Sequence, residues 1–188
     1  MSTLPSDLPV PEDDGACAHV SGARLPALAL PSTAGRQVDL SRFAGIVVVY
    51  CYPMTSRPGV PLPESWDGIP GARGCTPQAC SFRDHHREIQ HLGADLFGVS
   101  TQTTDYQREA AERLRLPFEL LSDAELKFSS ALKLPTFQAD GMMLIKRLTL
   151  VARDGVVEKV FYPVFPPARN VDDVITWLRY DRYAILGG

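Results

Sequence analysis

One short segment, residues 46–51, restricts the possible folds of this chain more than any other. It reads Ile-Val-Val-Val-Tyr-Cys, without the alternation of apolar and polar residues that marks a half-buried strand. A continuous β-branched run of this length is typical of a strand buried on both faces. Such strands lie in parallel sheets whose faces are covered by helices. We therefore expect this segment to be a central strand of an α/β domain.

Alternating helix-like and strand-like patterns follow this segment. A helix is predicted over about 76–92, with Thr76 as its N-cap, Pro77 at its first position and Gly93 at its end. Asp95–Ser100 is predicted to be the next parallel strand. Farther along, the patterns indicate a helix over 104–114, a strand over 118–121 and a short helix over 124–132. Two strands, over 144–151 and 156–162, and a last helix from Asn170 onwards follow.

The last part of the chain indicates that the sheet is mixed. Asp154-Gly155 separates the last two predicted strands, and Asp-Gly between strand-like runs is a strong hairpin signal. The final helix carries apolar residues at helical spacing, namely Val171, Val174, Ile175 and Leu178. Parallel strands followed by a hairpin predict an α/β fold with a mixed central sheet and helices on both faces.

Two segments depart from this alternation. Residues 1–22 are rich in Pro, Asp, Gly and Ser, so we expect a mobile N-terminal arm before a domain spanning 23–188. Residues 53–74 hold five prolines, four glycines and Trp66, which predicts a stiff irregular loop. A loop this long inside a compact domain is usually functional, and this one leads directly to Cys75.

Composition excludes several classes of protein. The 188 residues carry a net charge of −3 without a basic block, so neither nucleic acid nor an anionic membrane surface is an expected partner. The longest apolar run is too short to span a bilayer, and the acidic N-terminus does not resemble a secretory signal. We therefore expect a cytoplasmic location. Four cysteines are too few for a disulfide scaffold, so each needs its own explanation.

The cysteine pair at the start of the predicted helix carries the chemistry. At about 100° per residue, Cys75 projects within about 20° of Phe82 on the expected core face, whereas Cys80 projects about 140° away from Cys75. A helix N-terminus stabilises a thiolate, which is the reactive form of cysteine, and Arg73 and Arg83 are close in sequence. Cys75 is therefore a candidate nucleophile.

These two cysteines cannot form a disulfide while the helix is intact. Five residues of helical rise separate their Cα atoms by about 7.5 Å along the axis, whereas bridged cysteines need about 4.4–6.8 Å. We hypothesise that the first turns unwind after oxidation of Cys75. From the spacing alone, two unrelated helix cysteines remain an alternative. A metal site is disfavoured, because His19, His85, His86 and His91 offer no ligand pair at suitable spacing.

The segment Gly74-Cys75-Thr76-Pro77-Gln78-Ala79-Cys80-Ser81-Phe82-Arg83-Asp84 resembles the active-site helix of a peroxiredoxin branch. That branch, bacterioferritin-comigratory protein or PrxQ, carries Gly-Cys-Thr-x-x-Ala-Cys-x-Phe-Arg-Asp there. The resemblance covers about residues 24–180. It includes Leu25–Pro31, Val48–Pro53, Phe97–Ser100 and Lys146–Val151.

This resemblance implies a thioredoxin-like fold and a hydroperoxide substrate. It implies that Cys75 is the peroxidatic cysteine, that Cys80 is the resolving cysteine and that Arg147 stabilises the thiolate and the polarised O–O bond. A guanidinium suits this function because it stays charged and donates in a planar fork. The implied reductant is a thioredoxin-like or glutaredoxin-like protein, and no metal or flavin cofactor is expected.

One departure from the family motif concerns peroxide binding. The family carries Pro-x-x-x-Thr-x-x-Cys before the peroxidatic cysteine, but Ala72 stands three residues before Cys75. The start of the motif is displaced to Pro53 by an insertion of about fifteen residues. We expect Pro53 to keep its place, and either Thr55 or Ser56 to supply the hydroxyl unless that contact is lost.

The other cysteines and Trp66 have less specific expectations. Cys51 lies in the predicted buried strand and is expected to be inert, whereas Cys17 is expected to be an exposed thiol of the arm or to pair between chains. Trp66 either anchors a docking surface or packs the loop onto the domain. The sequence leaves a monomer and a homodimer equally open.

Three other functions are alternatives on a related fold. A thiol–disulfide oxidoreductase is expected to carry Cys-x-x-Cys, which is absent. A copper-handling protein of the redoxin type needs a histidine late in the chain, and none follows His91. A glutathione-peroxidase-like site needs a Gln and Trp partnership that the sequence does not reveal.

Overall fold

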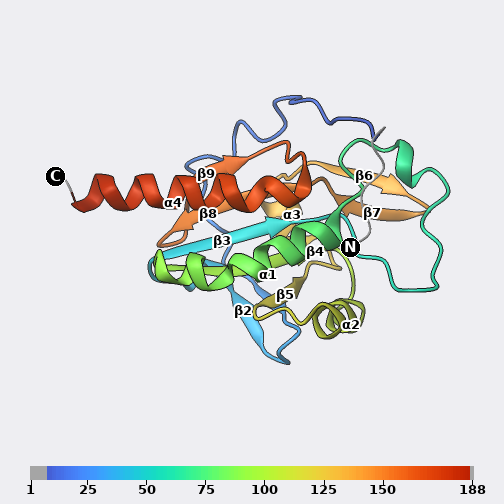
Figure 1. The fold of residues 1–188 in the computed structure, drawn as a ribbon, viewed down its shortest axis with the longest axis horizontal. Helices are drawn as coiled ribbons and strands as arrows, with labels where there is room; N and C mark the ends of the chain where they lie inside the picture. The colour runs from blue at the N-terminus through green and yellow to red at the C-terminus, as the bar shows by residue number, and fades with distance from the viewer. Residues whose placement is uncertain (1–7, 187–188) are drawn as a thin grey trace.

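A computed structural model describes residues 8–186, with side chains up to residue 181. Its centre is a five-stranded mixed sheet in the order β5-β4-β3-β8-β9 (Figure 1). Three strands are parallel, namely β3 (Ile46–Cys51), β4 (Ala94–Ser100) and β5 (Glu119–Ser122). The antiparallel strands are β8 (Leu148–Arg153) and β9 (Val156–Phe161). The predicted mixed sheet is confirmed, and β3 is its central strand, buried at all six positions.

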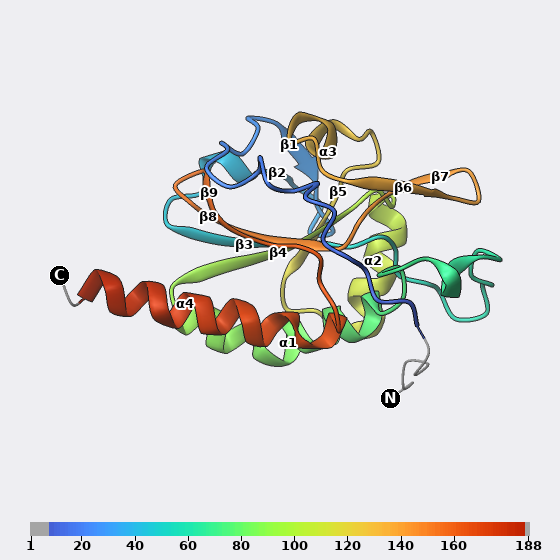
Figure 2. The same cartoon turned by 90° about the horizontal axis from the view of Figure 1, so that it is seen from above.

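Helices cover both faces of this sheet, as predicted. Figure 2 shows α1 (Cys75–His91) and α4 (Asn170–Leu186) on one face, and α3 (Lys127–Ala131) with β1 (Ala29–Pro31) and β2 (Gln37–Asp39) on the other. Between β4 and β5 the chain forms α2 (Thr104–Leu114). Alternate residues of β3 enter the two main hydrophobic clusters, which is why the strand has no polar side chain facing water.

The long strand predicted over 144–151 is two strands. Met142–Ile145 is β7, which pairs with β6 (Thr136–Ala139) in a separate hairpin, and β8 begins only at Leu148. The backbone leaves the ladder at Lys146, whose N–H bonds to Pro135. Lys146 and Arg147 mark the break in the sequence, but apolar residues on both sides of them led to the prediction of one strand.

The predicted turn and last helix are confirmed, with one correction. Asp154 and Gly155 both have positive φ, 48° and 77°, as a tight hairpin between β8 and β9 requires. The four predicted apolar residues of α4 are buried. Asn170, however, does not cap the helix by its side chain. Its Oδ1 instead accepts hydrogen bonds from Gln78 and Thr149.

The described part of the N-terminal segment packs onto the domain, whereas its composition predicted a mobile arm. Val20 is fully buried and Cys17 is 6% exposed, both within the cluster on the β1 side of the sheet. Gly22 bonds to the carbonyl of Val157, and Asp14 pairs with Lys146. A few apolar residues thus attach this segment to the domain despite its polar composition. Residues 1–7 lie outside the described residues.

The insertion forms an extension beside the β6–β7 hairpin, at one end of the molecule (Figure 1). Trp66 begins a short 3-10 helix, η2 (Trp66–Gly68), and is 3% exposed. It packs against Phe137 of β6 with Leu144 of β7 in the same cluster. Trp66 therefore packs the loop onto the domain and is not available as an exposed docking anchor. Two further 3-10 helices are η1 (Leu40–Arg42) and η3 (Pro167–Arg169).

None of the helices within the described residues is long and apolar enough to cross a membrane.

Candidate active site

Two distant segments meet at the carboxyl end of β3. The chain leaves β3 after Cys51, passes through the insertion and returns at Cys75, the first residue of α1. Leu148 pairs with Cys51 across the antiparallel β3–β8 ladder. Arg147, immediately before β8, therefore lies at the same end of the sheet. This topology brings Cys75 and Arg147 together although 72 positions separate them.

The helix begins one residue earlier than predicted. Gly74 is its N-cap and has a φ of 104°, a conformation that a residue with a Cβ rarely adopts. Thr76 therefore lies inside the first turn and does not cap it, and Pro77 is the third helical residue. The N–H groups of Cys75 and Thr76 precede the first intrahelical bond, which runs from Gln78 to Gly74. This places the sulfur at the positive end of the helix.

All three nitrogen atoms of the Arg147 guanidinium donate hydrogen bonds, which fix it beside Cys75. Nη2 donates to the sulfur of Cys75 at 3.1 Å. The same side chain donates to three successive carbonyls at the end of the insertion, those of Gly71 at 3.2 Å, Ala72 at 3.0 Å and Arg73 at 3.1 Å. Arg147 is 3% exposed and has no carboxylate partner within the described residues. A buried guanidinium in this position can stabilise a thiolate.

Gln78 is a site residue that the sequence interpretation missed. Its Oε1 accepts a hydrogen bond from Arg147 Nη1, and its Nε2 donates to Asn170 Oδ1 at 3.0 Å. Thr149 also donates to Asn170 Oδ1, at 2.6 Å. The signal available in the sequence was the spacing, since a residue three positions after Cys75 shares its helix face. A glutamine on a core-facing position needs a buried partner.

A small recess lies beside the sulfur, between β3, α1 and α2. Its walls are mostly apolar and consist of Tyr50, Tyr52, Thr55, Cys75, Ala79, Ala110, Leu114, Leu116 and Leu120. Tyr50 stacks on Phe82 of α1, and burial raises the pKa of its hydroxyl well above the ordinary value. That hydroxyl has no hydrogen-bond partner among the described residues. Cys75 itself is 4% exposed, so its surroundings are dry.

The predicted substrate-binding residues occupy different places. Pro53 is buried directly after β3. Thr55 is 3% exposed and lines the recess, where its N–H and hydroxyl both donate to Gln102 Oε1, at 2.9 and 3.2 Å. Ser56 does not line the recess, and its carbonyl accepts from Arg113 of α2 at 2.9 Å. Of the two candidate hydroxyls, the structure brings that of Thr55 to the recess that contains Cys75.

Comparisons with known proteins agree with this site. The Redoxin family matches residues 20–175. Chloroplastic peroxiredoxin Q of Sedum lineare is 31% identical over 159 residues, which cover 84% of this chain and 77% of that protein. Peroxiredoxin Bcp of Escherichia coli (strain K12) is 32% identical over 164 residues, covering 85% and 95%. The crystal structure of peroxidoxin BcpB from Mycobacterium tuberculosis superposes with a TM-score of 0.69 at 28% identity, covering 85% and 96%. The chain belongs to the Q/Bcp branch of the peroxiredoxins.

This peroxiredoxin is therefore a thiol-dependent peroxidase with a thioredoxin-like fold. The family implies a peroxide substrate and a thiol reductant. The resemblance carried by the segment around Cys75 is confirmed by matches that span most of the chain.

Cys80 of this peroxiredoxin lies on the same continuous helix as Cys75. It is half-buried, and the guanidinium of Arg83 lies beside its thiol. Arg83 also donates to the carbonyl of Leu114 at 2.9 Å, and the Arg73 side chain pairs with Asp67. Neither arginine side chain is bonded to Cys75, so the two cysteines have separate cationic neighbours.

The remaining cysteines are buried on the opposite side of the sheet. Cys51 is fully buried, and burial raises the pKa of its thiol. Burial and the nearby charges of Asp14 and Asp13 raise the pKa of Cys17 to about 12. Cys17 is therefore neither the exposed thiol nor the interchain partner that a mobile arm suggested. Within residues 8–186, no group of His, Cys, Asp and Glu side chains is arranged to hold a metal ion.

Proposed function

We propose that Cys75 is the peroxidatic thiol of a two-cysteine peroxidase that reduces hydrogen peroxide or an organic hydroperoxide. The observation that carries this proposal is the 3.1 Å hydrogen bond from Arg147 to the sulfur of Cys75 at the start of α1. The thiolate attacks one peroxide oxygen, the O–O bond breaks, and the other oxygen leaves as water or an alcohol after taking up a proton. Cys75 becomes a sulfenic acid.

Arg147 is proposed to stabilise both partners of this step. Its charge favours the thiolate before attack and stabilises the negative charge that develops on the leaving oxygen. The N–H groups of Cys75 and Thr76, which precede the first intrahelical bond, are proposed as additional donors for the attacked oxygen. Because these donors are fixed by the fold, they need little rearrangement when charge moves.

We propose that Thr55, rather than Ser56, supplies the hydroxyl that the family motif places three residues before the cysteine. Its position in the recess supports this assignment, and Pro53, the proposed start of the motif, is buried two residues after the end of β3. The Thr55 hydroxyl donates to Gln102 in this structure. It therefore has to reorient, or to accept rather than donate, when peroxide is bound.

Cys80 is proposed to condense with the Cys75 sulfenic acid, releasing water and forming a disulfide. Since both residues lie on an intact helix, the first turns of α1 must unwind for this step. A thioredoxin-like or glutaredoxin-like protein then supplies two electrons and two protons to restore both thiols. We propose that the protein operates in the cytoplasm, because that compartment supplies such reductants. The proposal includes both a monomer and a homodimer.

A coupled peroxidase assay on variants that each have one cysteine replaced by serine tests the proposal. Cys75→Ser is expected to abolish turnover and peroxide consumption. Cys80→Ser is expected to react once with peroxide and then to stop, and wild type is expected to yield a Cys75–Cys80 linked peptide by mass spectrometry. The matched control is Cys51→Ser, a cysteine on the other face of the sheet. Retained turnover in Cys75→Ser would overturn the proposal.

A further inference from the structure

A buried chain of hydrogen bonds runs from Arg147 to the start of α4. Arg147 can only donate, so it fixes Gln78 Oε1 as the acceptor and leaves Nε2 as the donor to Asn170. Asn170 must then present its Oδ1, which also accepts from Thr149. Gln78, Asn170, Thr149 and Arg147 are each at most 3% exposed. The positive charge beside Cys75 thus dictates the orientation of every member of the chain.

The same glutamine lies in the segment that has to unwind. Gln78 and Ser81 flank Cys80, and both attach α1 to the segment that begins α4. Gln78 bonds to Asn170, and the hydroxyl of Ser81 donates to the carbonyl of Ala168 in η3 at 2.7 Å. Cys80 cannot leave its helical position to approach Cys75 without breaking these two attachments.

We propose that Gln78 is a positioning residue that couples two steps of the catalytic cycle, an inference that rests on the proposed function. While α1 is folded, Gln78 holds the guanidinium of Arg147 on Cys75 and promotes attack on peroxide. By its second bond, to Asn170, it holds the helix closed and delays disulfide formation. The two steps therefore respond in opposite directions when Gln78 is changed.

One buried amide group without a hydrogen-bond partner lowers the stability of the closed helix. The Nδ2 atom of Asn170 is buried and has no hydrogen-bond partner among the described residues. Its orientation cannot be reversed, because Gln78 and Thr149 both need its oxygen as their acceptor. The closed state therefore carries the desolvation cost of an unpaired amide N–H, and opening to water removes that cost.

Three variants separate the two bonds of Gln78. Gln78→Met removes both. Gln78→Glu keeps an acceptor for Arg147 but, as a carboxylate, cannot donate to Asn170. Ser81→Ala loosens the helix without touching Arg147 and is the matched control. All three replacements are compatible with a helix, so helix propensity does not explain a large difference.

Two kinetic steps and one structural property are measured on each variant. Quenched-flow mass spectrometry gives the rate constant of Cys75 oxidation by hydrogen peroxide and that of Cys75–Cys80 disulfide formation. Hydrogen–deuterium exchange of amides 76–82 in the reduced protein reports helix opening without any reaction. We expect Gln78→Met to oxidise at least tenfold more slowly but to form the disulfide at least threefold faster. Ser81→Ala is expected to show only the faster disulfide formation. Gln78→Glu is expected to form the disulfide faster and to oxidise more slowly than wild type, because its carboxylate keeps the bond to Arg147 but offsets the charge that favours the Cys75 thiolate. All three variants are expected to exchange faster.

Several outcomes overturn the inference. They are an unchanged oxidation rate in Gln78→Met, slower disulfide formation in any variant, or unchanged exchange in Gln78→Glu. If wild type itself fails to react with peroxide at Cys75, the proposed function fails. In that case the exchange data still decide whether Gln78 holds the helix closed. If Gln78→Met does not fold, Gln78→Glu still reports both steps, and Ser81→Ala reports the attachment of the helix alone.

Discussion

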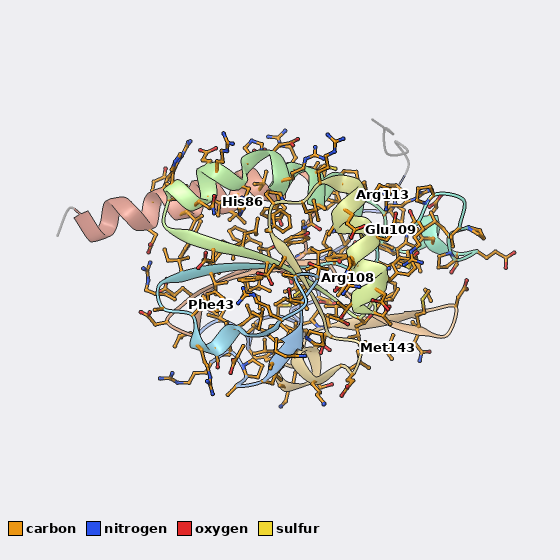
Figure 3. All side chains as sticks on the ribbon, turned by 90° about the horizontal axis from the view of Figure 1, so that it is seen from below. Phe43, His86, Arg108, Glu109, Arg113 and Met143 are labelled. Carbon is orange, nitrogen blue, oxygen red and sulfur yellow. The ribbon has the colours of Figure 1, made fainter. Side chains whose placement is uncertain are left out.

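The guanidinium of Arg57 lies 4.1 Å above the ring centre of Tyr106, so the start of the insertion is attached to α2. Arg57 is the fourth residue after Pro53, which is the spacing at which the family motif has its threonine. Its Nη2 also donates to the carbonyl of Asp105 at 3.3 Å. Arg113 adds a bond to the carbonyl of Ser56, and Figure 3 shows Arg113 and Glu109 together on α2, on the side of the insertion. Arg57, at the position of the family's threonine, is thus held on α2, and Thr55 is left in the recess that contains Cys75.

Removing this attachment is expected to expose Cys75. Tyr106→Ala deletes a cation–π contact of about 0.5–1 kcal/mol, which corresponds to about a two- to fivefold larger open population. Alkylation of Cys75 by iodoacetamide in the folded protein should accelerate by that factor. Arg108→Ala is the control, since Arg108 lies on the same helix and pairs with Asp105 at 2.7 Å without contacting the insertion. Equal rates in Tyr106→Ala and wild type would show that the attachment does not limit access.

Replacing Arg147 by lysine is expected to slow oxidation of Cys75 by about 10²–10³-fold. An ammonium keeps the charge but cannot donate simultaneously to the sulfur, to Gln78 and to three carbonyls at the end of the insertion. Single-turnover oxidation by hydrogen peroxide measures the loss. The neighbouring Lys146→Ala removes an exposed pair with Asp14 and should change the rate by less than about twofold. A rate for Arg147→Lys close to that of wild type would mean that charge alone is sufficient.

Local patterns were enough to predict the elements that hold the site. The β-branched run gave β3, the periodicity of 104–114 gave α2, and Asp154-Gly155 gave the last hairpin. Helix projection also placed Cys75 inside and Cys80 outside, as their burial confirms. These predictions succeeded because each depends on a repeat or turn within a few residues. Arg147 was different, since only the family resemblance linked it to Cys75 over 72 positions.

The errors arose where tertiary contacts override composition. Residues 14–22 are polar and aperiodic, yet Val20, Cys17 and the Asp14 pair attach them to the domain. Thr76 is a good N-cap residue, but the N-cap in the structure is Gly74, two residues earlier. Gln78 and Asn170 had local interpretations, a helix interior and a cap. Their bond to each other spans 92 positions, so neither local pattern contains it.

The packing of Tyr50 on Gly98 gives a stability prediction. A Cβ on Gly98 would lie 2.6 Å from Cδ2 of Leu120 and 2.7 Å from the hydroxyl of Tyr50. Gly98→Ala should therefore lower the free energy of unfolding by about 1–3 kcal/mol, because neither neighbour has room to move. Tyr50→Phe deletes a buried hydroxyl without a partner and should leave stability unchanged or raise it by up to about 1 kcal/mol. Urea unfolding measures both.

A double-mutant cycle checks that the two effects share one contact. Phenylalanine at position 50 removes one of the atoms that the new methyl group meets, so the double variant Gly98→Ala, Tyr50→Phe should be more stable than the sum of the single changes predicts. Strict additivity would show that the hydroxyl of Tyr50 does not contribute to the strain, which would then lie against Leu120 and the Tyr50 ring.

The N-terminal segment should loosen as the pH falls from about 4 to about 2. Hydrogen bonds from Lys146 and Tyr162 lower the pKa of Asp14 to about 2, from 3.8. Because the folded state has the lower pKa, the stabilisation is complete above the unfolded value and is lost as Asp14 becomes protonated. Cys17, three residues farther on and 6% exposed, reports this loosening.

In a variant with the other three cysteines replaced by serine, labelling of Cys17 by 4,4′-dithiodipyridine should accelerate between pH 4 and pH 2. Asp14→Asn should label faster at pH 5 and lose that pH dependence. The control is Asp13→Asn, which also removes a charge near Cys17 but not the bonds to Lys146 and Tyr162, and it should keep the pH dependence of its parent. Labelling that is constant from pH 5 to pH 2 in the parent would contradict an attachment through Asp14.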